Sequence, residues 1–431
     1  MTHDHPHAGR PHPSPLARHF PLDPAVVFLN HGSFGCCPNQ VLEKQAEYRD
    51  LMEAEPVRFF NQTLYELTDR SREAIARTLG GAPEDFVFVP NATTGVATVI
   101  DNLLPTLGPG DELIAAVDEY PACRHIFERA AGRTGATFRT FPISHDRTIT
   151  PEMLFDTVLA QVSERTRLVL LSHVTSPSAL VLPVERLVPA LRERGVECLV
   201  DGAHAPGSLP VSFRDFDPAY YLWNCHKWFC SPKGVAVMRV RADLRATFRP
   251  MVLSNEAHLD RGYGGRSKYS NEFDYVGTDD YTARFAVADA IGAMPRIAAE
   301  GGHAGWAGII AHNHGLVLRG REILADALGV EPRIDPACIA AIATLPLPDV
   351  PESHLERLGS RPTIYADALQ DALVGRHGVQ VPVWRTGSQL GGDRFDGRRY
   401  IRISAQLYNS EEQYRFLARA LLEELERELA G

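Results

Sequence analysis

Lys227 stands in an unusual context for a lysine, between His226 and Trp228 in the run YYLWNCHKWFCSPKG. Aromatic and cysteine side chains leave an ammonium ion little water, and two interpretations are open. In the first, the flexible stem carries the amine to the surface. In the second, burial lowers the pKa of the amine and makes it a nucleophile or a Schiff-base former. Other residues of the chain bear on this choice.

Further residues that could do chemistry follow apolar runs with the character of buried strands. Asp201 ends the run ECLVD, and Tyr120 follows ELIAAVDE. Thr93 and Thr94 come directly after FVFVPNA, where a strand pattern gives way to a helix pattern. The free N–H groups and the dipole of a helix N-terminus favour a phosphate there. Taken singly, Asp201 would be interpreted as a loop cap and NATTG as a helix cap.

The order of these residues is more informative than any one of them. The threonines come first, then the aspartate, then the lysine 26 positions after Asp201. An enzyme that uses pyridoxal 5'-phosphate needs an anion site, a carboxylate that keeps the pyridine nitrogen protonated, and a lysine that forms a Schiff base. The sequence therefore predicts this cofactor, with Lys227 as its lysine. The ring of Tyr120 is expected to stack on the pyridine face.

Motifs for other cofactors and for metals are missing from the sequence. It has no GxxxxGK[ST] phosphate loop, and no strand pattern precedes GYGGRS, as a dinucleotide fingerprint requires. The stretch HGSFG does not match the GxSxG nucleophile elbow. No HExxH or CxxC spacing is present, and no metal site is predicted.

Charge and composition exclude several classes of function. A net charge of −10 argues against a nucleic-acid surface, because phosphates bind clustered lysine and arginine. No apolar run approaches the roughly 20 residues of a membrane span, and the start MTHDHPHAGRPHPSP lacks the apolar region of a signal peptide. Seven cysteines, an odd number without a CxxC pair, favour a reducing compartment, and we expect the cytoplasm.

Apolar runs alternate with helical patterns, which predicts an α/β fold with its ligand at the carboxyl ends of the strands. The predicted strands are FVFVP, DELIAAV, RLVLLSHV, VECLVD and GVAVMRV, and the predicted helix LVPALRERG ends at Gly195. After about residue 285 helices dominate, with VQVPVW and RRYIRISA as the clearest strands and SEEQYRFLARALLEELEREL as the last helix. We therefore divide the chain into a flexible His- and Pro-rich tail (1–25), a large cofactor-binding domain (26–285) and a smaller C-terminal α+β domain (286–431).

Eight motifs occur from about residue 28 to residue 409: LNHGSFGCCP, NATTGVATV, DEYPA, SHVTSPSALVLPV, VDGAHAPG, WNCHKWFCSPKG, VGTDDYTA and YIRISAQLYN. In these motifs and in their order, the chain resembles the class V aminotransferase superfamily, in the branch around isopenicillin N epimerase. The resemblance implies the pyridoxal-phosphate fold type I, in which a large domain with a mainly parallel seven-stranded sheet is followed by a smaller C-terminal α+β domain.

By position, the resemblance also implies how the cofactor is held. Lys227 corresponds to the Schiff-base lysine, Asp201 to the partner of the pyridinium nitrogen, and His204 to a residue near the phenolic oxygen. Tyr120 corresponds to the residue stacked on the ring. The residues expected at the phosphate are Thr93, Thr94, Asn224 and His226.

The substrate side and the assembly are implied in the same way. Arg402 matches the arginine that clamps the substrate carboxylate, a task that suits the guanidinium fork. Asn30 and His31 lie in the segment that closes over the substrate. Thr278 corresponds to a residue that reaches the phosphate of the neighbouring subunit, which implies a homodimer with a shared active site.

The fold leaves the reaction open, because the family's reactions share their first steps. In each, the freed Lys227 amine removes the α-proton of an amino-acid-like substrate. We expect first an epimerase or racemase acting on an amino acid or peptide-like amine, with Tyr120 and His31 as candidates for the second acid. The alternatives are a C–S lyase that cleaves a cysteine conjugate or sulfoxide, and a class V aminotransferase.

Two other functions are disfavoured. Cysteine desulfurases carry a nucleophilic cysteine on a loop ahead of the C-terminal arginine strand, whereas VWRTGSQLGGDRFDGRRY has none and Cys338 is the last cysteine. A non-catalytic cofactor-binding regulator usually carries a fused DNA-binding domain, for which this acidic chain leaves no room. The presence of both Lys227 and Arg402 also favours catalysis.

Overall fold

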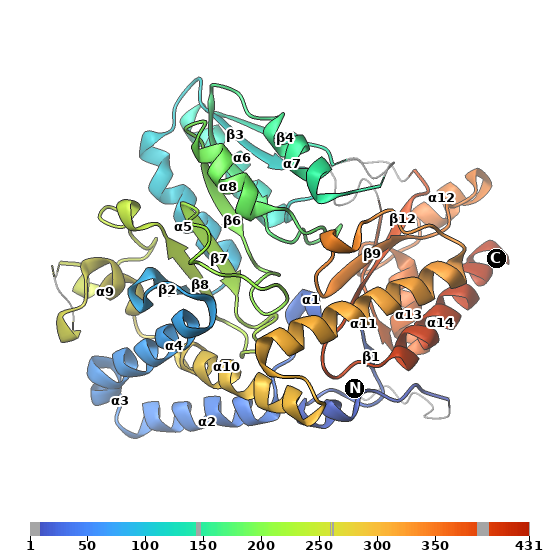
Figure 1. Ribbon diagram of the computed structural model, residues 1–431, viewed down its shortest axis with the longest axis horizontal. Helices are drawn as coiled ribbons and strands as arrows, with labels where there is room; N and C mark the ends of the chain where they lie inside the picture. The colour runs from blue at the N-terminus through green and yellow to red at the C-terminus, as the bar shows by residue number, and fades with distance from the viewer. Residues whose placement is uncertain (1–8, 144–147, 259, 261–262, 386–395, 431) are drawn as a thin grey trace.

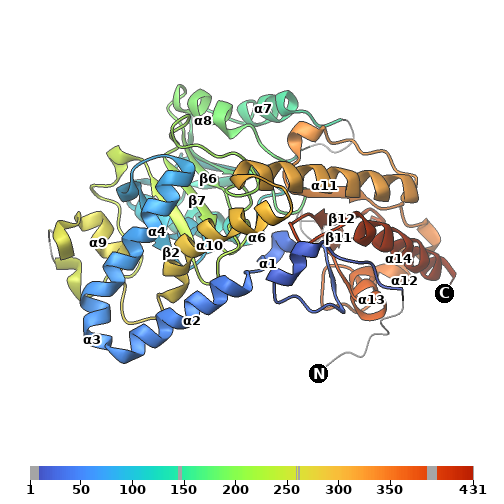
Figure 2. The same cartoon turned by 60° about the horizontal axis from the view of Figure 1, so that its bottom comes forward.

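A computed structural model describes residues 9–143, 148–258, 260, 263–385 and 396–430 of the 431-residue chain. Figures 1 and 2 show a large sheet covered by helices and, beside it, a smaller sheet packed against long helices.

Within the described residues the large sheet has seven strands, in the order β2-β8-β7-β6-β5-β3-β4. β8 is antiparallel to both of its neighbours, and the other strands run parallel to one another. This confirms the mainly parallel seven-stranded sheet of fold type I. The strands are β2 (Phe86–Val89), β3 (Glu112–Ala116), β4 (Thr137–Phe141), β5 (Thr166–Ser172), β6 (Glu197–Asp201), β7 (Tyr220–Asn224) and β8 (Ala236–Val240).

Both faces of this sheet are buried, which explains why its inner strands read as continuous apolar runs. In β3, Leu113 packs with α5 and α6 on one face, and Ile114 packs with α4, α7 and α8 on the other. The covering helices are α4 (Leu64–Leu79), α5 (Ala92–Leu103), α6 (Pro121–Thr134), α7 (Pro151–Leu159) and α8 (Val184–Arg192).

The smaller sheet is antiparallel and has the order β11-β12-β9 in the part of the chain that the structure describes. Its buried face, with Leu345, Ile401 and Ile403, packs against α11, α13 and α14. The elements are β9 (Ile342–Pro346), β11 (Val383–Arg385), β12 (Arg399–Ser404), α11 (Gly305–Leu328), α13 (Ala368–His377) and α14 (Glu411–Ala430).

The N-terminal segment crosses to this smaller part. β1 (Val27–Phe28) pairs in parallel with β10 (Val379–Gln380), so residues directly after the predicted tail pack with the C-terminal region. The division at residues 25 and 285 stays a prediction. The remaining helices are α1 (His31–Phe34), α2 (Asn39–Ala54), α3 (Pro56–Arg58), α9 (Lys268–Asp274), α10 (Thr282–Glu300) and α12 (Leu355–Gly359).

The predicted strand VQVPVW is wrong as a single strand. It forms β10 and β11, which belong to different sheets, and Pro382 lies between them. Proline has no N–H to donate to a ladder and interrupts a strand at this point. β4, whose sequence TFRTF is mostly solvent-accessible, escaped prediction because an edge strand of this kind leaves no apolar run.

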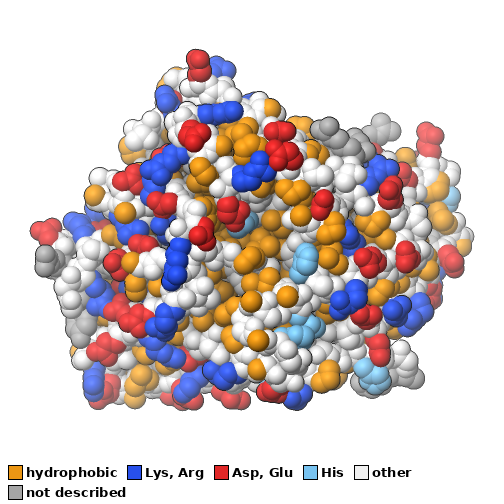
Figure 3. All heavy atoms as spheres, in the orientation of Figure 1, with side chains coloured by type: hydrophobic (Ala, Val, Ile, Leu, Met, Phe, Trp, Pro, Cys, Tyr) orange, Lys and Arg blue, Asp and Glu red, His pale blue; other side chains and the backbone are white. Residues whose placement is uncertain are grey.

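Charged side chains of both signs are interspersed over the face of the molecule seen in Figure 1, with apolar side chains near its centre (Figure 3). Of the helices that the structure describes, none is both long and apolar enough to cross a membrane. The described residues also contain no cluster of three or more His, Cys, Asp or Glu side chains that could hold a metal ion.

Candidate active site

A cavity of about 330 Å³ lies where β5, β6 and β7 end and where α5 begins. Parallel strands deliver their last residues to one edge of a sheet, so Ser172, Asp201 and Asn224 all reach this cavity. The predicted site residues that line it are Thr93, Tyr120, Asp201, His204, Asn224, His226, Lys227 and Arg402.

Lys227 reaches the cavity from the turn that follows β7. Its Nζ lies 2.9 Å from Nε2 of His204. Burial lowers the pKa of Lys227 to about 8, against the opposing charge of Asp201. An amine with this pKa is partly neutral near physiological pH and can act as a base or a nucleophile.

His204 is buried beside that amine. Burial, and then the charge of Lys227, hold the pKa of His204 well below its usual value, so the imidazole is neutral. Nδ1 of His204 accepts a hydrogen bond of 3.4 Å from the indole N–H of Trp228. The indole nitrogen is only a donor, which leaves the proton of the neutral ring on Nε2, facing Lys227.

Asp201 lies at the floor of the cavity and is 4% exposed. Its Oδ1 accepts a hydrogen bond from the backbone N–H of Ala203 at 2.8 Å. Oδ2 meets only the thiol of Cys123, at 3.7 Å, within the described residues. Burial raises the pKa of Asp201, and a cationic partner at Oδ2 would offset that effect.

The other end of the cavity is formed by the first turn of α5. Asn224 Oδ1 accepts the backbone N–H of Ala92 at 3.0 Å and so joins β7 to this helix. Thr93 and His226 also line this end. The Nδ1 atom of His226 is buried and has no hydrogen-bond partner among the described residues. The first turn of a helix with hydroxyl and imidazole groups around it is suited to an anion.

Two predicted phosphate residues lie outside this cavity. Thr94 is engaged in the helix cap, where its N–H donates to Asn91 Oδ1 at 2.9 Å, and its side chain lines a neighbouring cavity. Thr278 is exposed, and its hydroxyl lies 3.3 Å from that of Tyr275. The role foreseen for Thr278 concerns a neighbouring subunit and stays a prediction.

Arg402 lies on β12 of the smaller sheet and lines the cavity. It is 6% exposed, and its guanidinium donates to the carbonyl of Ser176, to Oγ of Ser33 at 3.0 Å and to Oδ1 of Asn30 at 3.3 Å. All of these acceptors are neutral, and burial lowers the pKa of Arg402 to about 10. A buried cation that no carboxylate of the described residues pairs with is suited to an incoming carboxylate.

His31 does not line the cavity, although its neighbours Gly32, Ser33 and Phe34 do. Its ring is fully buried, with Nδ1 at 2.7 Å from the Tyr408 hydroxyl and Nε2 at 2.9 Å from the backbone carbonyl of Lys227. Burial lowers the pKa of His31 to about 3. The ring therefore supports the backbone of Lys227 and is poorly suited to donate a proton to a substrate.

Sequence reasoning missed Glu119 and Ser172 as a pair. Glu119 is fully buried behind Ser172, whose backbone N–H donates to Oε1 at 2.6 Å and whose hydroxyl donates to Oε2. Burial raises the pKa of Glu119 to about 8. Both residues belong to motifs quoted above, DEYPA and SHVTSPSALVLPV, but no spacing indicated that they meet.

The chemistry of the cavity fits pyridoxal 5'-phosphate. Asp201 would accept the protonated ring nitrogen at the sparsely bonded Oδ2, and Tyr120, which is 46% exposed at the cavity wall, would cover a face of the ring. The unpartnered Nδ1 of His226 lies at the end that would take the phosphate, together with Thr93 and Asn224.

Comparison with known proteins agrees with the cofactor that this cavity fits. Residues 27–326 match the family model described as Aminotransferase class-V. The chain is 31% identical over 412 residues to an "Isopenicillin N epimerase" of Amycolatopsis lactamdurans, covering 93% of this chain and 96% of the relative. It is 30% identical over 412 residues to a "Putative L-cysteine desulfhydrase 1" of Oryza sativa subsp. japonica, covering 92% of this chain and 82% of the relative.

The fold also matches solved structures. A structure of a C-DES mutant with glycine covalently linked to the PLP cofactor superimposes with a TM-score of 0.76 and 21% sequence identity, covering 94% of this chain and 98% of that chain. The chain therefore belongs to the class V aminotransferase family of pyridoxal-phosphate enzymes, and pyridoxal 5'-phosphate is its cofactor.

Proposed function

We propose that this enzyme is a C–S lyase that removes the sulfur substituent from an S-substituted L-cysteine. The observation that carries the proposal is that the cavity offers one well-placed base, Lys227, while His31, a candidate for a second acid, is buried outside it with a pKa lowered to about 3. Elimination requires one base, whereas epimerisation requires a proton donor on each face of the α-carbon.

Each cavity residue has a part in this reaction. Bound pyridoxal phosphate supplies the electron sink that makes the α-proton acidic. Arg402 holds the substrate carboxylate, and the Nζ of Lys227 takes the α-proton. The Cβ–S bond breaks and its electron pair leaves with sulfur. With one water consumed, the products are a thiol, pyruvate and ammonium.

Five other residues of the cavity assist Lys227 or hold the cofactor. The neutral His204 donates its Nε2–H to the amine and keeps it available as a base. The Asp201 carboxylate holds the protonated ring nitrogen. Thr93, Asn224 and His226 bind the phosphate and keep the cofactor from leaving with the product.

Epimerisation is the second candidate, and the relative named isopenicillin N epimerase favours it. Tyr120 is the residue that could serve it, because its side chain lines the cavity and is 46% exposed. The same phenol is assigned above to cover the cofactor ring. An epimerase would need Tyr120 to deliver a proton to the face opposite Lys227.

We also propose a cytoplasmic homodimer in which Thr278 approaches the partner's phosphate. All seven cysteines are buried and free, which suits a reducing compartment. Phe34 at the cavity is 70% exposed, and Val252, which lines the neighbouring cavity with Thr94, is 59% exposed, as expected of side chains that a partner would cover. Light scattering that finds only monomer in the active enzyme would contradict the dimer.

The experiment is a product assay on a panel of S-substituted cysteines. The wild-type enzyme should form pyruvate and the free thiol in equal amounts. Lys227→Ala should lose roughly a thousandfold in rate, the typical contribution of a positioned base. Lys44→Ala, a change at an exposed lysine that pairs with Glu47, should keep the activity. A wild-type enzyme that forms no pyruvate from any member but interconverts L- and D-amino acids would refute the lyase assignment.

A further inference from the structure

A second cavity, of about 350 Å³, borders the smaller sheet. Its lining includes Arg321, Arg333, Thr344, Pro346, Arg398 and Tyr400. The acidic side chains of Glu331 and Asp349 also line it, with Ile149 and Val330 among its apolar walls. The cavity is therefore mixed in character, with three arginines facing two acids.

This cavity lies on the same face of the sheet as Arg402. Side chains two residues apart in a strand point to the same face, so Tyr400 and Arg402 of β12 share a face. Their partners on β9, Pro346 and Thr344, share it too. Thr344 also donates from its hydroxyl to the carbonyl of Pro177 at 3.0 Å, next to the Ser176 that holds Arg402.

Two residues beside Arg321 are held in place by their neighbours, Arg398 by an acid and Tyr400 by an aromatic ring. Nη2 of Arg398 lies 2.9 Å from Oδ2 of Asp396. The ring of Tyr400 stacks on that of Trp384, with centroids 4.5 Å apart and 15° between the planes. The cavity thus has a rigid aromatic wall beside its basic groups.

Arg321 is the unusual residue of this cavity. It is 6% exposed, and Nη1 donates to the carbonyl of Ile334 at 2.7 Å. Its Nε is buried without a hydrogen-bond partner, and none of the ion pairs between described residues includes its guanidinium. Burial lowers the pKa of Arg321, against the opposing charges of Glu322 and Asp335, neither of which forms an ion pair with it. A buried guanidinium without an ion pair destabilises the folded protein unless an anion binds to it.

The other buried arginines of the described chain show how rare this is. Arg284 has no ion pair but lies over the rings of Phe88 and Tyr281. Among the buried arginines of the described residues, only Arg321 and Arg402 have neither an ion pair nor an aromatic face, and Arg402 faces the substrate cavity. The ion-paired ones are Arg72 with Asp274, Arg239 with Asp217, Arg241 with Glu197, and Arg399 with Glu428.

We propose that the second cavity is a binding site for the carboxylate of a small organic anion, with Arg321 as its anchor and Tyr400 and the apolar wall as the platform for the rest of the molecule. The ligand is either the distal end of an extended substrate or a separate small acid. Both have the same chemistry, a carboxylate on an apolar body.

Binding can be tested on the holoenzyme without an activity assay. We choose benzoate as the probe and benzamide, which has the same shape without the charge, as its control. Calorimetry should find saturable binding of benzoate that Arg321→Gln weakens roughly tenfold or more, about 1.4 kcal/mol, since hydrogen bonds to charged groups contribute at least that much. Arg319→Gln, a change of an exposed arginine on the same helix, should leave the binding unchanged.

The Arg321→Gln variant is expected to fold, because it removes a buried charge that forms no ion pair with a described residue. Its melting temperature should equal or exceed that of Arg319→Gln. Arg321→Lys provides a second variant, which keeps the charge, loses the fork and should bind benzoate with an intermediate Kd.

Steady-state kinetics then distinguish the two sources of the carboxylate. The kinetic experiment rests on the proposed lyase reaction and uses S-benzyl-cysteine with and without a para-carboxylate. If the site takes the end of the substrate, Arg321→Gln raises KM for the carboxylated substrate alone. If it takes a separate acid, benzoate alters kcat for the plain substrate without competing with it.

The proposal is overturned if benzoate binds no better than benzamide, or if its Kd is the same in the wild type and in Arg321→Gln. It is equally overturned if Arg402→Ala abolishes the binding and Arg321→Gln does not, because benzoate then occupies the substrate cavity. Failure of the lyase reaction leaves these binding results intact, so the two proposals fail separately.

Discussion

The amine of Lys227 lies 2.9 Å from Nε2 of His204, and the hydrogen bond from Trp228 to the other nitrogen of that ring sets the direction of the contact. Because the indole N–H occupies Nδ1, the neutral imidazole carries its proton on Nε2 and donates it to the lysine. A protonated lysine would have no acceptor there. The arrangement therefore favours the neutral amine that a base must be.

Trp228→Phe should raise the pKa of Lys227, because Nδ1 could then carry the proton and Nε2 could accept from an ammonium. A neutral hydrogen bond contributes roughly 1 kcal/mol, which corresponds to about 0.7 of a pKa unit. Competitive acylation of the cofactor-depleted protein across a pH series, read by mass spectrometry at Lys227, measures this pKa directly. An unchanged or lower pKa would show that Trp228 does not determine which nitrogen of His204 carries the proton.

Glu119 should make stability depend on pH in a defined window. Burial raises its pKa to about 8 from the ordinary 4.5, so between these values the folded state binds more protons than the unfolded state. Stability contributed by Glu119 is thus present below pH 4.5 and is lost as the pH rises towards 8. Glu119→Gln keeps an acceptor for the Ser172 N–H and removes the titration. Urea midpoints of the two proteins should diverge in favour of the variant as the pH rises, and parallel curves would contradict the raised pKa.

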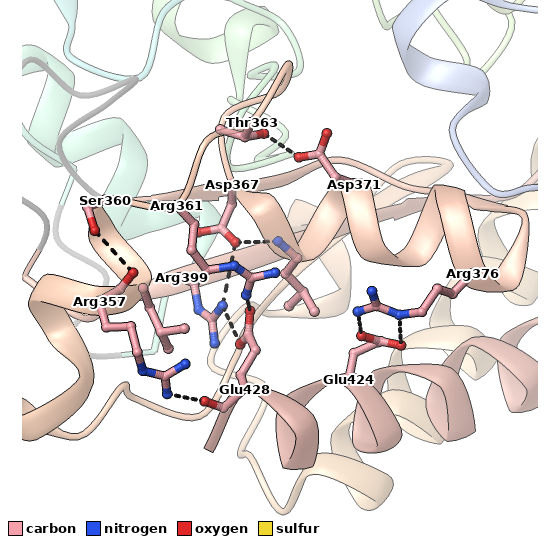
Figure 4. Close-up of polar contacts among 12 residues, drawn as sticks. Arg357, Ser360, Arg361, Thr363, Asp367, Asp371, Arg376, Arg399, Glu424 and Glu428 are labelled. Atoms are coloured by element: carbon pink, nitrogen blue, oxygen red, sulfur yellow. Dashed lines mark hydrogen bonds and ion pairs between the residues drawn. The ribbon is translucent and has the colours of Figure 1, made fainter. Parts of the chain in front are cut away.

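A buried ionic network fixes the strand that carries Arg402. Figure 4 shows Arg399 between Asp367 and Glu428, with Nη1 at 3.5 and 2.8 Å from the nearest carboxylate oxygens. Arg361 also donates to Glu428, at 2.7 Å. The network joins β12 to α14 and to the start of α13, and it lies on the opposite face of β12 from Arg402.

Arg399→Met should destabilise the protein by about 3 kcal/mol, the lower part of the range for breaking a buried pair. The loss is limited because Asp367 keeps its ion pair with Arg385 and Glu428 keeps its ion pair with Arg361. Urea unfolding measures the loss. Arg415→Met serves as the control, since its ion pair with Glu411 is exposed and should contribute less than about 1 kcal/mol. Equal stability of the two variants would show that the network adds little.

The sequence is sufficient to predict those site residues whose place in the fold is determined by the end of a strand. Asp201 and Lys227 were predicted from a strand end and an aromatic context, and both lie in the cavity because parallel strands meet at one edge. Thr93 and Thr94 are adjacent, and only the cap hydrogen bond to Asn91 decides that Thr93 faces the cavity. A motif does not contain that information.

Long-range contacts were beyond the reach of the sequence. The ring of His31 turns towards Tyr408, 377 positions away, and its motif gave no sign of this direction. Glu119 and Ser172 meet because β3 and β5 are neighbours, which local periodicity does not reveal. The order of strands in a sheet is set by packing of the whole domain, so such pairs appear only once the fold is known.

If Lys227 is the one base that acts on the α-carbon, protons enter from one face only, and the fate of the α-hydrogen in heavy water shows this. The wild-type enzyme is incubated in heavy water with an S-substituted L-cysteine, and the recovered amino acid is analysed on a chiral column with mass detection. We predict pyruvate and thiol as products, with any deuterium at the α-carbon of the recovered substrate confined to the L-isomer. Accumulation of deuterated D-isomer without pyruvate would contradict this, because it requires a second proton donor on the opposite face.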